Sequence, residues 1–297
     1  MLDTVIIGSG PAGLAAAIYA SRAALNYVVL EKAGYSGGQI VTTNDLDNYP
    51  GMPNIDGASF SMALQEHAEK LGAEIKEATV TAIKQNEDNS YTVEIEGQEP
   101  ILTKSVVLAT GANPRTLNVP GEQQYLSRGV YYCATCDGAF YRNKTTAVIG
   151  GGNTALEDVL FLAKICEKVY LIHRRDELRG DKHSQEKIFA MPNVEFVKSA
   201  LPKSIKGDKK VSAIEIEYKK TGEIVDIPVD GIFVAVGMIP NNQLVPDFVN
   251  TDDAGKTNAK GFFVAGDLRT KDLRQVLTAA SDGANAIKSV TDYLNEI

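Results

Sequence analysis

The sequence has no tryptophan and only three cysteines among its 297 residues. Three cysteines cannot build the disulfide framework of a small secreted protein, so we expect a hydrophobic core and a reducing compartment. Positive charge is also scarce, because 30 Lys and Arg stand against 38 Asp and Glu, giving a formal net charge of -8. Nucleic-acid-binding proteins normally carry the opposite bias. We therefore expect no nucleic-acid partner.

The chain also lacks a continuous apolar N-terminal segment of membrane length. Residues 4–21 carry no charged side chain, but Gly8, Gly10 and Pro11 interrupt the stretch. The residue before it is Asp3, where a secretory signal would carry positive charge. A spanning helix needs about 20 predominantly apolar residues without such breakers. We expect a cytoplasmic protein that has no membrane partner.

What the chain does contain is an internal duplication. Residues 4–31 are arranged as a short apolar strand, a glycine-rich turn, a helix-compatible run and a second strand. Residues 146–173 repeat this order, with Gly150-Gly151-Gly152-Asn153-Thr154-Ala155 as the turn and a helical run reaching Lys164. The later stretches 107–114 and 233–240 both contain Ala-x-Gly-x-x-Pro. The two halves are therefore expected to share one fold.

The length and the duplication together predict the domain organisation. About 150 residues per domain gives two domains. We predict an α/β protein with two Rossmann-like, three-layer nucleotide-binding domains, the second inserted into the first. The first would comprise residues 1–113 plus 244–297, including a third apolar strand at 262–267, and the second residues 114–243. Residues 113–115 and 240–242 would link them.

The glycine turns predict where nucleotides bind. In Gly-x-Gly-x-x-Gly the backbone can approach a pyrophosphate closely, while the next helix supplies N–H donors and a positive dipole. The alternative is two tight turns without a ligand. The register of the following strand indicates which nucleotide fits, because Glu31 lies 23 positions after Gly8 and His173 lies 23 after Gly150.

The residues at this register differ in charge. An acidic residue accepts hydrogen bonds from a ribose 2′-hydroxyl, so Glu31 predicts FAD or NAD in the first domain. His173 is followed by Arg174, Arg175 and Arg179. Guanidinium groups bind a 2′-phosphate, so the second domain should prefer NADP(H). The alternative is a solvated basic patch.

Two of the three cysteines form a Cys-x-x-Cys pair, Cys133 and Cys136. A helix that begins at the pair would lower the pKa of the first thiol, and the adjacent Asp137 could move protons. A zinc site is the competing interpretation, but it usually needs four ligands and no second pair has the right spacing. We expect Cys166 to be a core residue at the end of an apolar helical stretch, 160–166.

These features together resemble the low-molecular-weight thioredoxin reductases, a family of flavoprotein disulfide reductases. The resemblance covers nearly the whole chain. Its further markers are Gly37-Gly38-Gln39, Asn48-Tyr49-Pro50-Gly51, Ala109-Thr110-Gly111 and Gly266-Asp267 with Arg274-Gln275. The placement of the cysteine pair in the second domain is its most specific feature. One departure is Phe262-Phe263, which stands where an aromatic pair with tryptophan is often seen.

The resemblance implies a set of site residues and roles. FAD would contact Gly8, Ser9, Gly10, Pro11, Ala12, Gly13, Glu31, Gly38, Gln39, Asn48, Val80, Ala109, Gly111, Asp267, and, on the following helix, Arg274, Gln275 and Val276. NADPH would contact Gly150, Gly152, Asn153, Thr154, Ala155, His173, Arg174, Arg175 and Arg179. Cys136 would face the flavin, Cys133 would attack the disulfide of thioredoxin, and Asp137 would be the acid/base. No metal is implied, and a homodimer is expected.

Several functions remain open at this point. The implied activity is NADPH-dependent reduction of thioredoxin or a thioredoxin-like protein. The same scaffold could serve a peroxiredoxin-system or glutaredoxin-like partner, or another electron donor. A non-catalytic redox sensor and a zinc-binding module are the alternatives from other classes. The cysteine pair argues against the related ferredoxin–NADP reductases, which lack it.

Overall fold

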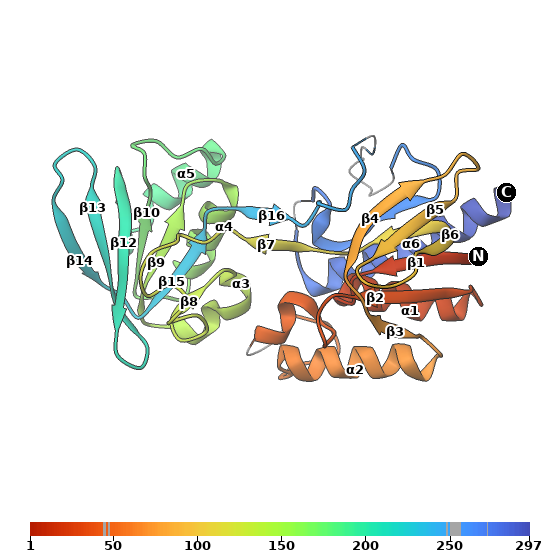
Figure 1. The fold of residues 1–297 in the computed structure, drawn as a ribbon. Coiled ribbons are helices and arrows are strands. Elements are labelled where there is room, and N and C mark those ends of the chain that lie inside the picture. The colour runs from red at the N-terminus through yellow and green to blue at the C-terminus, as the bar shows by residue number, and fades with distance from the viewer. Residues whose placement is uncertain (44–45, 47, 248, 250–256, 272) are drawn as a thin grey trace. The chain divides into compact units, whose positions relative to one another are not determined.

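The computed structural model describes residues 1–43, 46, 48–247, 249, 257–271 and 273–297. Contacts divide the chain into two compact units. The first holds residues 1–42, 49–113 and 240–297, and the second holds 43–48 and 114–239. Two short strands, β7 (Ala112–Pro114) and β16 (Met238–Pro240), pair with each other where the chain passes between the units (Figure 1).

The first unit is built on a parallel sheet. Its strands are β3 (Ile75–Glu77), β2 (Tyr27–Glu31), β1 (Leu2–Ile7) and β6 (Ile101–Leu108), in that order. Beyond them, β6 pairs in parallel with β17 (Phe262–Val264) and antiparallel with β5 (Tyr91–Ile95), which pairs with β4 (Val80–Gln85). The apolar stretch predicted at 262–267 is therefore a strand of this sheet, although it ends at Val264.

Both faces of this sheet are buried. Alternate residues of β1 point to opposite faces, as a strand requires, so Ile6 lies in one core and Val5 and Ile7 lie in the other. The first core packs against α1 (Pro11–Arg22), α2 (Gly57–Lys70) and α6 (Val276–Glu296). The second core packs under the β4–β5 hairpin. The result is a three-layer arrangement. Two short 3₁₀ turns, η1 (Gly38–Thr42) and η3 (Gly266–Leu268), lie in the connections.

The second unit repeats this plan. Its parallel sheet has the order β11 (Val194–Val197), β10 (Lys168–Ile172), β9 (Thr145–Gly150), β15 (Gly231–Ala235) and β8 (Val130–Tyr131). An antiparallel sheet of β12 (Ala200–Gly207), β13 (Val211–Tyr218) and β14 (Ile224–Pro228) covers one face. The other face packs against α4 (Asn153–Leu162), α3 (Ala134–Asp137), the η2 turn (Gly138–Tyr141) and α5 (Lys182–Phe189).

The strand orders confirm the predicted fold class and duplication, because β3-β2-β1-β6 in one unit corresponds to β11-β10-β9-β15 in the other. One detail of the prediction is wrong. Helix α4 ends at Leu162, so Cys166 lies after the helix, although it is buried as expected. None of the helices among the described residues has both the length and the apolar character that a membrane span requires.

Candidate functional site

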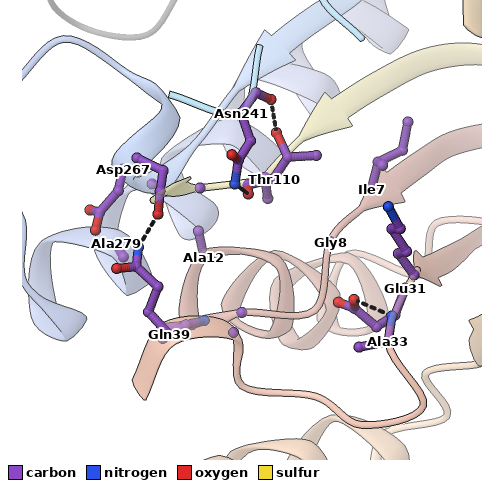
Figure 2. A pocket seen from close by; sticks show the side chains of 18 of the residues that line it. Ile7, Gly8, Ala12, Glu31, Ala33, Gln39, Thr110, Asn241, Asp267 and Ala279 are labelled. Atoms are coloured by element: carbon purple, nitrogen blue, oxygen red, sulfur yellow. Dashed lines mark hydrogen bonds between the residues drawn. The ribbon is translucent and has the colours of Figure 1, made fainter. Parts of the chain in front are cut away.

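A cavity of about 770 Å³ lies in the first unit, where β1, β2 and β6 end (Figure 2). Parallel sheets bind ligands at this edge, where neighbouring connections leave in opposite directions. The cavity brings together thirteen of the residues predicted for FAD: Gly8, Gly10, Pro11, Ala12, Glu31, Gly38, Gln39, Val80, Ala109, Gly111, Asp267, Gln275 and Val276.

The glycines of the first turn have different tasks. A Cβ on Gly8 would lie 2.5 Å from the carbonyl oxygen of Ala109, and one on Gly13 would lie 1.8 Å from that of Gly8. These two glycines are required by the packing of turn, strand and helix. A Cβ on Gly10 would have no neighbour closer than 3.9 Å. Gly10 therefore leaves space on the cavity side, where a ligand can approach the backbone.

The helix that follows Gly10 has no side-chain cap. Gly10 is the N-cap of α1, and the first turn of this helix carries no acidic residue. By contrast, the Asp56 carboxylate caps α2 by accepting the Ser59 N–H at 2.8 Å. An uncapped N-terminus directs unsatisfied N–H groups and a positive partial charge outward. The cavity wall formed by α1 therefore suits an anionic group such as a pyrophosphate.

Glu31 supports the glycine turn as well as lining the cavity. Its Oε2 accepts hydrogen bonds from the backbone N–H and the hydroxyl of Ser9, both at 2.7 Å, and its Oε1 accepts the Ala33 N–H at 2.9 Å. A carboxylate has about four acceptor positions. Three are occupied here, so the side chain is held in place and can accept one more donor.

Four residues predicted for FAD are not among those that line the cavity: Ser9, Gly13, Asn48 and Arg274. Ser9 and Gly13 are buried behind the turn, and Asn48 is exposed. Arg274 lies before α6 rather than on it, since the helix begins at Val276. Its guanidinium donates to the carbonyl oxygens of Asp267 (3.4 Å) and Arg269 (3.2 Å). Arg274 therefore holds the segment that carries Asp267.

Sequence reasoning missed part of the cavity wall. Thr110 and Asn241 both line it and hold each other, because the Thr110 hydroxyl donates to the Asn241 carbonyl at 2.7 Å and the Asn241 amide donates to the Thr110 carbonyl at 2.9 Å (Figure 2). Asn241 was predicted to be a linker residue. The contact joins residues 131 positions apart, so no local pattern could indicate it.

A second cavity of about 430 Å³ lies in the second unit, where β9, β10 and β15 end. It is lined by six residues predicted for NADPH: Gly150, Gly152, Thr154, His173, Arg174 and Arg179. Asn153, Ala155 and Arg175 are not among its lining residues. Ala155 is fully buried, and a Cβ on Gly150 would lie 2.7 Å from its side chain. Like α1, α4 has a glycine as its N-cap residue, Gly152, and therefore has no side-chain cap.

His173 is buried against the glycine turn of this unit. A Cβ on Gly151 would lie 2.4 to 2.7 Å from three atoms of the His173 ring, so only glycine fits beside this imidazole. The ring also interacts with the backbone of Gly150, and its buried Nε2 has no hydrogen-bond partner among the described residues. Burial and the nearby Arg179, Arg174 and Arg175 lower the pKa of His173. The imidazole is therefore neutral near pH 7.

The three arginines of this motif are exposed, and none forms an ion pair with a described residue. Arg115 also lines the cavity and, beside Arg174 and Arg179, adds a third lining guanidinium that the sequence did not predict. Ala235 and Gly237 line it as well. The repeated Ala-x-Gly could have indicated them, since Ala109 and Gly111 were assigned to the first site by the same motif.

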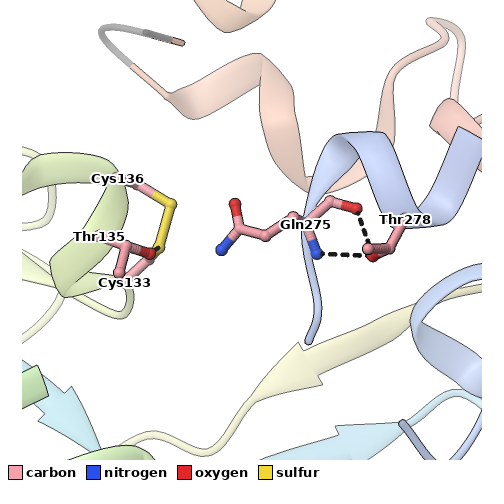
Figure 3. Close-up of a disulfide and its surroundings, with 5 residues drawn as sticks. All are labelled: Cys133, Thr135, Cys136, Gln275 and Thr278. Atoms are coloured by element: carbon pink, nitrogen blue, oxygen red, sulfur yellow. Dashed lines mark hydrogen bonds between the residues drawn. A yellow bond between two sulfur atoms is a disulfide. The ribbon is translucent and has the colours of Figure 1, made fainter. Parts of the chain in front are cut away.

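The cysteine pair forms a disulfide in the second unit (Figure 3). Cys133 is the N-cap of α3 and Cys136 lies in this four-residue helix, with 5.3 Å between their Cα atoms. Both cysteines are partly exposed. The Thr135 hydroxyl lies 3.4 Å from the Cys133 sulfur. Of the two chemistries predicted for the pair, this arrangement is that of a redox disulfide.

Two buried carboxyl groups accompany the disulfide. Burial raises the pKa of Asp137, which is 9% exposed, to about 6. On α4, burial raises the pKa of Asp158 to about 7, and interaction with the backbone N–H of Ala134 partly opposes the shift. Both groups can take up or give a proton near neutral pH. Asp158 was not predicted as a site residue, because it is far from the cysteine pair in sequence and no local pattern indicates that it lies near the pair.

The close contact between Gly151 and His173 predicts that substitutions at these two positions have coupled effects on stability. We expect Gly151→Ala to lower stability by about 1–3 kcal/mol, because the new methyl group must displace the ring. The same substitution should cost less in a His173→Ala background, where the ring is absent. Urea denaturation of the two single variants, the double variant and the unmodified protein measures the coupling. Additive effects would contradict the described contact.

The pKa of Asp137 predicts a pH-dependent stability. The folded-state pKa of about 6 lies above the ordinary 3.8, so folding favours the protonated group and stability is lost as the pH rises through 6. Asp137→Asn removes this loss. Between pH 5 and pH 8, the stability of the variant should gain about 1–2 kcal/mol relative to the unmodified protein. Urea denaturation tests this, with the exposed Asp292→Asn as control. A constant difference would contradict the assignment.

Comparison with known proteins identifies the family of this chain. The sequence pattern of the family described as "Pyridine nucleotide-disulphide oxidoreductase" matches residues 2–283. A thioredoxin reductase of Treponema pallidum (strain Nichols) is 39% identical over 303 residues, covering 99% of this chain and 98% of the relative. One of Bacillus subtilis (strain 168) is 37% identical over 304 residues, covering 99% and 95%.

A solved structure gives the same result for the fold. The crystal structure of thioredoxin reductase from Streptococcus pyogenes MGAS5005 matches with a TM-score of 0.90 and 42% identity, covering 100% of this chain and 99% of that one. The resemblance inferred from the motifs is therefore confirmed. The chain belongs to the pyridine nucleotide-disulphide oxidoreductase family.

Proposed function

We propose that this protein is a thioredoxin-disulfide reductase. It takes two electrons from NADPH and, by means of FAD and the Cys133–Cys136 disulfide, reduces the disulfide of thioredoxin or a thioredoxin-like protein. The observation that carries the proposal is the partly exposed disulfide in a unit that also holds a dinucleotide cavity rimmed by arginines. The similar thioredoxin reductases support the choice of partner.

The first cavity fits FAD. Its volume of about 770 Å³, the space beside Gly10 and the uncapped N-terminus of α1 suit a dinucleotide with its pyrophosphate against the turn. Glu31 keeps one acceptor position for a ribose hydroxyl. The Oδ1 atom of Asp267 is buried and makes no hydrogen bond to a described residue, as expected for a group that awaits a donor from a ligand. We assign FAD to the unit of residues 1–42, 49–113 and 240–297.

The second cavity fits NADPH. The uncapped N-terminus of α4 suits the pyrophosphate, and Arg174 and Arg179 at the rim suit a 2′-phosphate. His173 also lines the cavity, but burial and the nearby arginines lower its pKa, so the arginines supply the charge that distinguishes NADPH from NADH. A direct contact between Arg175 and NADPH has less support, because Arg175 is not among the residues that line the cavity.

The chemistry of the cysteine pair follows from its surroundings. Bound FAD supplies two-electron transfer between NADPH and the disulfide. Cleavage of the Cys133–Cys136 bond takes two electrons and two protons and gives a dithiol. The Cys133 thiolate then attacks the partner's disulfide, forming a mixed disulfide and releasing one partner thiolate, which takes up a proton. Attack by Cys136 re-forms the internal bond and releases the second partner thiol.

Two neighbouring groups favour this order of attack. The Thr135 hydroxyl at 3.4 Å can donate to a thiolate on Cys133. Asp137, with its pKa of about 6, can protonate the departing thiolate and recover the proton later. A dithiol that must be regenerated suits the cytoplasm, and by resemblance we expect a homodimer. The cytoplasmic location and the homodimer are both part of the proposal.

Replacing Cys136 by Ser tests the function directly. The variant cannot form the internal disulfide, so NADPH-dependent reduction of thioredoxin should fall to background. Cys166→Ser is the matched control, because Cys166 is buried and outside the disulfide. Steady NADPH consumption, followed by absorbance, measures turnover. Full activity of the Cys136→Ser variant would refute the mechanism, and one stoichiometric reduction by the unmodified protein would indicate a redox sensor.

The choice of electron donor gives a second test. Arg174→Ala removes a guanidinium at the cavity rim, so kcat/KM for NADPH should fall about 10- to 100-fold, in line with the loss of a charged hydrogen bond. The kcat/KM for NADH should stay the same. Arg142→Ala, an exposed arginine outside the cavity, is the control. Equal losses for both nucleotides would remove the role assigned to the arginines.

A further inference from the structure

A single buried carboxylate ties the segment between β17 and α6 to the helix. Asp282 of α6 accepts the N–H of Gly266 at 3.1 Å, and it forms ion pairs with Arg269 and with Lys271, the latter at 2.8 Å. One side chain therefore holds both ends and the middle of residues 266–271. Sequence analysis gave a role to Asp267 of this segment, but none to Arg269, Lys271 or Asp282.

The burial of these charges sets them apart. The side chains of Arg269, Lys271 and Asp282 are 12%, 10% and 11% exposed. In the other ion pairs between described residues, apart from Lys271–Asp267, at least one side chain is 40% exposed or more. Burying charged groups costs free energy, and apolar contacts would anchor a segment at least as well. A network of this kind next to a residue that lines a cavity, Asp267, therefore points to a role in binding.

The network reaches the first cavity through Asp267. Lys271 bridges the two carboxylates, because its Nζ also lies 3.8 Å from Asp267 Oδ1. Asp267 is one of the residues that line the cavity, and its buried Oδ1 makes no hydrogen bond to any described residue. The charged groups that face it are Lys271, Arg274 and Asp282. Burial raises the pKa of Asp267, and the two cations oppose the shift.

We propose that Asp282 is a positioning residue for the flavin cofactor. With Arg269 and Lys271 it fixes residues 266–271 so that Asp267 presents its carboxylate to bound FAD. A charged carboxylate is an acceptor only, so it selects a donor such as a hydroxyl of the cofactor. This inference rests on the proposed function only in taking FAD as the ligand.

Titration of the flavin-free protein with FAD tests the proposal without any enzyme assay. In Asp282→Asn the amide keeps the size of the side chain but cannot balance two buried cations. We expect the Kd for FAD to rise at least tenfold and the increase in Tm caused by FAD to shrink. The matched control is Asp292→Asn on the same helix, whose ion pair with Lys288 is 71% and 56% exposed. Its Kd should stay within twofold of the unmodified protein.

A second variant isolates the role of Lys271. In Lys271→Gln the ion pair between Asp282 and Arg269 remains, so folding is retained, but Asp267 loses its nearest described cation. Protonation of Asp267 then begins at higher pH. We expect the Kd for FAD of this variant to rise more from pH 8 to pH 6 than that of the unmodified protein.

The outcomes separate the network from the proposed function. An unchanged Kd for FAD in Asp282→Asn, even with lower Tm values of both the flavin-free and flavin-bound forms, would show a purely structural role and overturn the proposal. If that variant does not fold, an unchanged Kd of Lys271→Gln at both pH values overturns it. Failure of the unmodified protein to bind FAD would refute the proposed function itself.

Discussion

The structure depends on the close approach of a turn and a neighbouring strand end, which occurs once in each unit. A Cβ on Gly8 would lie 2.5 Å from the carbonyl oxygen of Ala109, and one on Gly150 would lie 2.3 Å from that of Ala235. The first glycine of each turn thus packs on the Ala-x-Gly at the end of β6 in one unit and of β15 in the other. This contact explains why the two motifs are repeated together. It also places an uncapped helix N-terminus at the edge where the cavity forms.

The same constraint accounts for the residue 23 positions after the first glycine. In both halves this residue contacts the second residue of the turn. Glu31 accepts two hydrogen bonds from Ser9, whereas the His173 ring fills the space that a side chain on Gly151 would need. The identity of the strand-end residue therefore decides what the turn can contain. The strand-end residue and the turn sequence are coupled physically, so a change of one requires a change of the other.

Local patterns predicted the parts of the site whose geometry is local. The turns, the helices after them and the strand-end residues follow from spacing within some 30 residues, and these predictions agree with the structure. Contacts between distant segments could not be predicted in this way. The Thr110–Asn241 pair, Arg115 at the second cavity and Asp158 beneath the disulfide all depend on how the sheet edges meet. Arg274 shows a related limit, since proximity to Asp267 in sequence did not reveal that its side chain turns to backbone carbonyls.

The buried carboxyl groups divide into two kinds according to their partners. Asp137 and Asp158, beside the disulfide, have no cation among the interactions that shift their pKa, so burial raises those values to about 6 and about 7. Such groups can exchange protons while sulfur–sulfur bonds form and break. Asp267, which lines the first cavity, and its neighbour Asp282 instead form ion pairs with Lys271, and Asp282 also pairs with Arg269. Carboxylates held by such ion pairs have fixed positions, which suits them to holding a ligand. A neighbouring cation therefore separates the carboxylates that we propose to fix a position at the first cavity from the carboxyl groups beside the disulfide, which can move a proton.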